Sequence, residues 1–99
     1  MIIAEGSQVS PEAYGYTNSP GCYSKEQIDG WKKVTKAVHD KGGKIFLQLW
    51  HVGPYSHSLL QPGNKLPLSP SGVKLDGQVL TQDGHKEYET PRIMTIEEI

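Results

Sequence analysis

The sequence predicts an α/β fold in which an amphipathic helix connects two parallel strands. Three observations carry this prediction. Short apolar runs stand at Met1–Ala4 and Lys44–Trp50, and a well-delimited helical pattern lies between them. An apolar run with no strict alternation is typical of a parallel strand that is covered on both faces. The order strand, loop, helix, strand is that of a βαβ unit, whose crossover is expected to be right-handed.

The first strand is expected over Met1–Ala4, because this apolar run ends in polar, turn-rich sequence. From Glu5 to Tyr23 the chain is rich in Gly, Pro, Ser, Asn and Tyr, and it predicts a long loop. Loops of this length are uncommon inside a compact domain and often carry function. We therefore expect functional residues in this segment.

The helix has clear start and stop signals. Ser24 is a candidate N-cap, and Gln27 three residues later completes a capping box. Gly42-Gly43 supplies the left-handed stop. Five residues fall within about 120° of one face at about 100° per residue, and they predict the buried stripe: Ile28, Trp31, Val34, Thr35 and Val38.

The second strand, Lys44–Trp50, carries one polar residue, Gln48, in its apolar middle. Alternation of side chains along a strand places Phe46, Gln48 and Trp50 on one face. The opposite face is aliphatic throughout and suits covering helices; it consists of Ile45, Leu47 and Leu49.

The remaining sequence predicts loops and one hairpin. His51–Pro70 is loop-like, and the segments Gln78–Thr81 and His85–Glu89 flank the turn signal Asp83-Gly84. Thr95 and Glu98 form a further capping box, yet the sequence stops at Ile99. A helix start with no helix after it leads us to expect that the chain is a truncated piece of a longer domain.

Composition excludes several classes of function. A net charge of −1 gives no basic face for nucleic acid, and no run of apolar residues is long enough to span a membrane. The single cysteine, Cys22, cannot form an internal disulfide and fits a reducing compartment, so a cytoplasmic location is expected. His51 and His57 have no carboxylate or cysteine at a metal-binding spacing, so no metal site is expected.

Gln48 is the first candidate for function. An amide inside an apolar strand must find hydrogen-bond partners or cost roughly 1–3 kcal/mol. Gln48 is either a core amide bonded to neighbouring backbone or an amide that faces a polar ligand, and the residues alone leave both open. Ligands of parallel α/β folds bind beyond the carboxyl ends of the strands, which is where Trp50 lies. Trp50 taken alone is more often a core aromatic than a site residue.

Several strings, in order, resemble the Old Yellow Enzyme family of flavin oxidoreductases. Together they cover essentially all of residues 1–99, and Gln48–Gly53 is the most specific of them. The strings are Ile2–Ser10, Gly15-Tyr16, Pro20–Gln27, Trp31–Val34, Ala37–His39, Lys41–Gly43, Phe46–Gly53, Ser56-His57, Gln61–Gly63 and Thr90–Arg92. One departure is Pro54, where the family commonly has arginine.

The resemblance implies a fragment of a (β/α)₈ TIM barrel, made of one βαβ unit with an inserted loop and β-hairpin. Residues 1–99 would be a partial domain running from barrel strand two to the start of helix three. By the same resemblance, Gly6 and Gln48 contact FMN, while Tyr16 and Trp50 border the substrate above the flavin. The family's proton donor, its substrate-binding histidines and its main flavin-phosphate contacts lie downstream, so no catalytic residue is expected in this chain.

The implied activity is reduction of an electron-poor alkene, such as an enone, nitro or imide compound, by FMN with NAD(P)H as reductant. The 99-residue chain alone is expected to be inactive and to associate with itself, unfold in part, or both. One alternative is a non-catalytic binding module that keeps the local fold. Another is a barrel enzyme in which Trp50 stacks on a sugar, although no carboxylates cluster near it.

Overall fold

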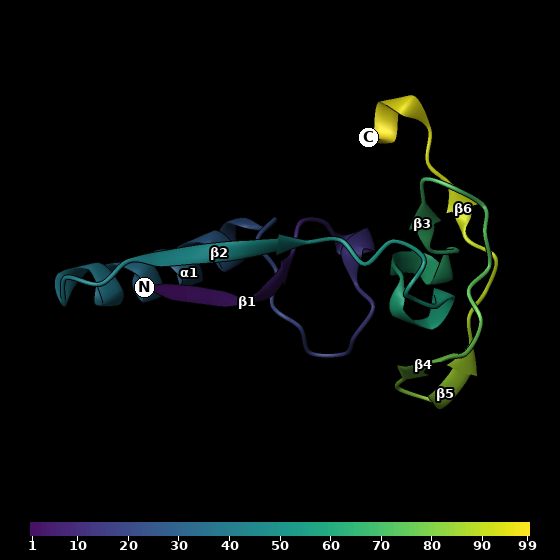
Figure 1. Cartoon of the computed structure of the whole chain (residues 1–99), viewed down its shortest axis with the longest axis horizontal. Helices are drawn as coiled ribbons and strands as arrows, with labels where there is room; N and C mark the ends of the chain where they lie inside the picture. The colour runs from purple at the N-terminus through teal and green to yellow at the C-terminus, as the bar shows by residue number, and fades with distance from the viewer.

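The computed structural model describes residues 1–99, which form an elongated molecule with extents of 46 × 33 × 23 Å. One end holds strand β1 (Ile2–Gln8), helix α1 (Lys25–Asp40) and strand β2 (Ile45–Trp50). Loops, short 3₁₀ turns and two small strand pairs make up the other end (Figure 1). The fold is mixed α/β and contains no closed barrel.

The predicted βαβ unit is confirmed, because β1 and β2 pair in parallel and α1 lies between them in the chain. Their register contains a bulge. Ile3 lies opposite Phe46, but the next pair is Gly6 with Gln48, so β1 uses one residue more than β2. A slip of one residue exchanges the two faces of a strand. The bulge therefore places Gly6, and not Glu5, beside Gln48.

Strand β1 is longer than the sequence predicts, since Glu5–Gln8 was expected to be loop. The strand continues because Gln8 pairs on its other side with the returning loop. Its backbone N–H donates to Pro20 O at 2.9 Å, and its carbonyl accepts from Cys22 N at 2.8 Å. The fully buried Gln8 amide is satisfied in the orientation whose nitrogen donates to Ala13 O at 2.8 Å.

The ends of α1 are confirmed. Gln27 N–H donates to Ser24 Oγ at 3.2 Å, and Ser24 N–H donates to Gln27 Oε1 at 3.0 Å. After Asp40 the chain leaves the helix through Gly42 at φ +73°, a conformation that favours glycine. The expected apolar stripe is only partly covered. Trp31 and Thr35 lie with Ile45 and Leu47 around a small gap between helix and sheet, whereas Ile28 and Val34 remain exposed.

The C-terminal half holds two strand pairs. The predicted hairpin is confirmed as β4 (Gln78–Thr81) and β5 (Gly84–Glu87), which pair antiparallel. Thr81 lies opposite Gly84, so the two-residue turn is Gln82-Asp83, one residue earlier than expected. The short parallel pair of β3 (Leu68–Ser69) with β6 (Arg92–Ile93) was not predicted.

The core is small and lies under the loops, not between helix and sheet. Only 15 of 99 residues are buried, and the apolar ones among them are Ala13, Val52, Leu68 and Val79. A polar network fills the same region: Ser56 Oγ donates to Tyr14 O, and Gln61 Nε2 donates to Tyr14 O and Ser56 Oγ. Both faces of the two-stranded sheet stay open, with Phe46 57% and Leu49 65% exposed.

The capping box at Thr95 is present and is followed by a 3₁₀ turn over Ile96–Glu98. Arg92 reinforces it, because its guanidinium donates to both carboxylate oxygens of Glu98, at 3.0 and 2.8 Å. This pair holds the pKa of Glu98 at about 2, well below its ordinary value of 4.5. None of the helices has the length and apolar character needed to cross a membrane.

Candidate functional site

The carboxyl ends of β1 and β2 bring three of the four expected site residues together. Gly6 lies opposite Gln48, and two residues further on Gln8 lies opposite Trp50. In-register neighbours on parallel strands project from the same face. Gly6, Gln48 and Trp50 thus share one face at the end of the sheet where α/β proteins bind ligands.

Gly6 makes room for the indole of Trp50. A Cβ atom on Gly6 would stand 1.9 Å from Trp50 Cε3, 2.7 Å from Cζ3 and 2.9 Å from Cδ2. No side chain fits in that space, so the indole rests directly on the Gly6 backbone. The packing of the Trp50 indole therefore explains why this position requires glycine.

Tyr16 joins the group from the loop that follows β1. Its ring centroid lies 5.9 Å from that of Trp50, with the two planes inclined by 44°. Ser19 Oγ donates to Tyr16 O at 3.2 Å and helps to hold the loop. Tyr16 is 55% exposed and Trp50 40% exposed, so both rings offer surface to a ligand.

The Gln48 side chain is exposed and makes no hydrogen bond within the chain. Other glutamines of the chain behave differently: the amides of Gln8, Gln27 and Gln61 all bond to neighbouring groups. Within residues 1–99, no backbone group bonds to the Gln48 side-chain amide. The Gln48 amide has a donor and an acceptor free for a ligand.

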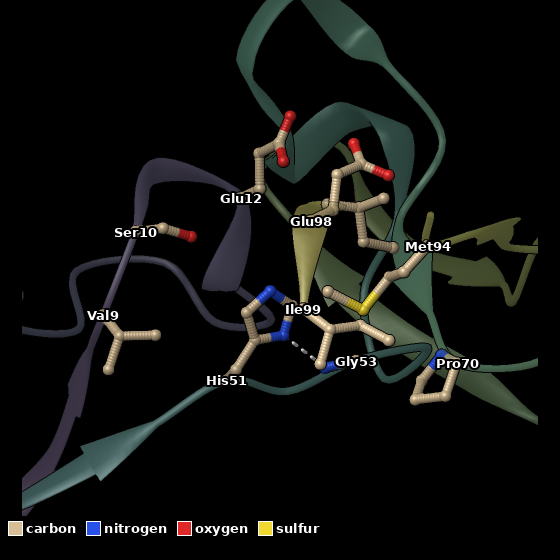
Figure 2. A pocket seen from close by; sticks show the side chains of 10 residues that line it. Val9, Ser10, Glu12, His51, Gly53, Pro70, Met94, Glu98 and Ile99 are labelled. Atoms are coloured by element: carbon tan, nitrogen blue, oxygen red, sulfur yellow. Dashed lines mark hydrogen bonds between the residues drawn. The ribbon is translucent and has the colours of Figure 1, made fainter. Parts of the chain in front are cut away.

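The largest cavity lies away from these residues. Its volume is about 580 Å³, and none of Gly6, Tyr16, Gln48 or Trp50 lines it. Figure 2 shows the His51 ring at its centre, with the carboxylates of Glu12 and Glu98 on one side. The rest of its lining is largely apolar: Val9, Leu68, Pro70, Met94 and Ile99, with Ser10 and Gly53.

His51 lies at that cavity, where its surroundings favour the neutral ring. Burial lowers its pKa below the ordinary 6.5, and the Glu12 carboxylate opposes the shift to a smaller extent. Gly53 N–H donates to His51 Nδ1 at 3.0 Å, so the neutral ring carries its proton on Nε2. No group of three or more His, Cys, Asp or Glu side chains is placed to hold a metal ion.

The structure adds an aromatic pair that the sequence did not reveal. Tyr55 follows β2, Tyr88 follows β5, and their ring centroids lie 5.9 Å apart at 86°, edge to face. Burial raises the pKa of Tyr88, and the nearby phenols of Tyr16 and Tyr55 raise it further. The fold of the hairpin determines where Tyr88 lies, so the residues around Tyr88 in the sequence could not predict this pair.

These features define a class of site. A glycine, an indole, a phenol ring and an unpaired amide stand together at the carboxyl end of a parallel strand pair. Flat aromatic surface binds planar rings by stacking, and the amide can pair with polar atoms at a ring edge. The arrangement is suited to a planar heterocycle with polar atoms at its edge.

Comparison with known proteins identifies the family. The model of the NADH:flavin oxidoreductase / NADH oxidase family matches residues 1–99. The 12-oxophytodienoate reductase 7 of Oryza sativa subsp. japonica is 43% identical over 102 residues, which are 100% of this chain and 26% of that protein. Flavin oxidoreductase hxnT of Emericella nidulans is 43% identical over 100 residues, again 100% of this chain and 25% of the relative.

Solved structures of proteins similar to this chain point to the same family. A complex of morphinone reductase with tetrahydroNAD has a TM-score of 0.86 and 43% identity, over 98% of this chain and 29% of that one. The old yellow enzyme homologue of Zymomonas mobilis also has a TM-score of 0.86, with 37% identity over 98% of this chain and 27% of its own. The chain belongs to the NADH:flavin oxidoreductase / NADH oxidase family, and the resemblance to the Old Yellow Enzymes is confirmed. It spans about a quarter of the curated relatives it matches.

Proposed function

We propose that residues 1–99 form barrel strands two and three, with the helix between them, of a (β/α)₈ flavin enzyme. The family match over the whole chain and the TM-score of 0.86 to morphinone reductase support this placement. The open faces of the β1–β2 sheet fit it as well. Phe46 and Leu49, on opposite faces of β2, are both more than half exposed and suit a strand that further elements cover.

Two features of the site fit FMN. An isoalloxazine ring is planar and carries donors and acceptors along its edge, and the free amide of Gln48 offers one donor and one acceptor group to such an edge. Gly6 and the indole on it give a flat surface without a projecting Cβ. Glycine has no side chain, so we assign the flavin contact at this position to the Gly6 backbone.

The proposed activity is reduction of an activated alkene, such as an enone, nitro or imide compound, with NAD(P)H as reductant. Bound FMN supplies the hydride-transfer chemistry, and this chain supplies positioning. Gln48 holds the ring edge, while Tyr16 and Trp50 border the substrate and exclude water from one side of it. We assign no catalytic residue to the chain, and we propose a cytoplasmic location because its lone cysteine suits a reducing compartment.

The observation that carries the proposal is the register that sets Gly6 opposite Gln48 at the carboxyl end of the strands. A chimera tests it, in which residues 1–99 replace the matching segment of morphinone reductase. We expect a yellow protein with stoichiometric FMN that reduces 2-cyclohexenone with NADH. A chimera that is folded by circular dichroism yet colourless would contradict the proposal, because the segment would then fail to complete the flavin site.

A further inference from the structure

Two aromatic pairs lie in segments that follow the carboxyl ends of β1 and β2, and their members come from three separate parts of the chain. Trp50 ends β2, Tyr16 lies in the loop after β1, and Tyr55 and Tyr88 come from the loop after β2 and from the end of the hairpin. The inner pair, Tyr16 with Trp50, and the outer pair, Tyr55 with Tyr88, each have a centroid separation of 5.9 Å.

The two pairs lie on neighbouring loops. Tyr88 packs edge to face on Tyr55 at 86°, and a Cβ atom on Gly15, next to Tyr16, would stand 2.2 Å from Tyr55 O, so the two loops that carry the pairs are in contact. The Tyr88 ring is half-buried, whereas Tyr16 is 55% and Tyr55 57% exposed. The outer pair thus lies beside the loop that carries Tyr16, and Tyr55 keeps a face open.

Hydrogen bonds hold the hairpin that carries Tyr88 against the segment that follows Tyr55. The Glu89 carboxylate accepts from Ser58 N–H at 2.7 Å and from Ser58 Oγ at 3.1 Å. Gln82 Nε2 donates to Leu59 O at 3.1 Å from the turn of the same hairpin. The tether joins the hairpin to the segment that follows Tyr55. Both rings of the outer pair are therefore set in place before any ligand arrives, which lowers the cost of binding to them.

We propose that Tyr55 and Tyr88 form a distal wall that favours substrates with a planar apolar ring beyond the reacting alkene. This inference rests on the proposed function. A small cyclic enone lying over the flavin reaches Trp50 and Tyr16 only. An aryl-substituted enone extends past them and stacks on the outer pair, so the pair contributes to the binding of the larger substrate alone.

The test compares two substrates, 2-cyclohexenone and 4-phenyl-3-buten-2-one, in the FMN-loaded chimera. Tyr88→Leu and Tyr55→Leu should each lower the ratio of kcat/KM for the aryl enone to that for cyclohexenone by about tenfold, the scale of one aromatic contact. The loss should appear as a higher KM for the aryl enone. Tyr88→Phe, which keeps the ring, should preserve the ratio, as should Lys86→Ala on the exposed face of the same hairpin.

The outcomes separate the two proposals. If the parent chimera reduces both enones and neither leucine variant changes the ratio, the distal wall is overturned and the proposed function stands. If the parent chimera binds no FMN and reduces neither enone, the proposed function itself has failed. Tyr55 is 57% exposed, so Tyr55→Leu keeps the fold and decides the question even if Tyr88→Leu does not fold.

Discussion

Replacing Gly6 with alanine should displace Trp50. The new Cβ would stand 1.9 Å from Cε3 of the indole, while carbon atoms pack at about 3.5–4.0 Å, so the ring must move by roughly 2 Å. Overpacking costs about 1–3 kcal/mol. Trp50 is 40% exposed and can swing outward, which favours the lower end of that range. Loss of the contact with Tyr16 adds about 0.5–1.5 kcal/mol, so we expect Gly6→Ala to destabilise the chain by about 1–2 kcal/mol.

The assay combines urea unfolding with ¹⁹F NMR of the chimera labelled with fluorotryptophan. Residues 1–99 contribute two tryptophans, Trp31 and Trp50, and their signals are assigned by replacing each in turn with phenylalanine. Gly6→Ala should shift the Trp50 signal and leave that of Trp31 in place, because Trp31 Nε1 remains bonded to Gly21 O at 3.0 Å.

Gly30→Ala is the matched control. It makes the same chemical change on α1, where a Cβ would meet nothing within 4 Å, and it should stabilise the chain by up to about 1 kcal/mol through helix propensity. The two substitutions should therefore change the free energy of unfolding in opposite directions. If Gly6→Ala is neutral and the Trp50 signal does not move, the packing of the indole on Gly6 is refuted.

Three further predictions follow from the same structure. The 99-residue chain should bind FMN weakly or not at all, because the phosphate site implied by the family resemblance lies elsewhere; stoichiometric sub-micromolar binding in a fluorescence titration would contradict this. The chain alone should associate or unfold in part, because its sheet faces and edges are open; a strict monomer in sedimentation with a sharp two-state melt would be the opposite result. Arg92 should hold the pKa of Glu98 at about 2, so the contribution of Glu98 to stability is present above pH 4.5 and is lost as the pH falls through about 2. Carbon-detected NMR of the carboxylate should show that low pKa and its return toward 4.5 in Arg92→Gln, and a titration near 4.5 in the unsubstituted chain would refute the ion pair.

Elements specified by neighbouring residues could be predicted from the sequence. The capping box of Ser24 and Gln27 and the stop at Gly42 depend on residues within one or two turns, and the structure has both. Turn chemistry predicted a hairpin over 78–89; the structure has it over 78–87, with the turn one residue earlier. Strand alternation alone put Gln48 and Trp50 on one face.

Features that depend on distant partners could not be predicted. The bulge between Ile3 and Gly6 arises only when β1 meets β2, and it decides which residue faces Gln48. The extension of β1 to Gln8 depends on the returning loop at Pro20 and Cys22. The pairing of β3 with β6 joins residues more than twenty positions apart. The contact of Tyr55 with Tyr88 needs the whole tethered hairpin.

The FMN affinity of a Gln48→Leu variant of the chimera tests the central claim most directly. Leucine keeps the bulk of the side chain and removes its amide, and the strand should remain folded because Ile45 and Leu47 still pack against α1. Loss of one net hydrogen bond should weaken FMN binding by about 1–1.5 kcal/mol, roughly tenfold in Kd. Gln78→Leu, the same change on an exposed residue of β4, should leave Kd as it was. If Gln48→Leu also leaves Kd unchanged, Gln48 does not hold the flavin and the assignment of this site is wrong.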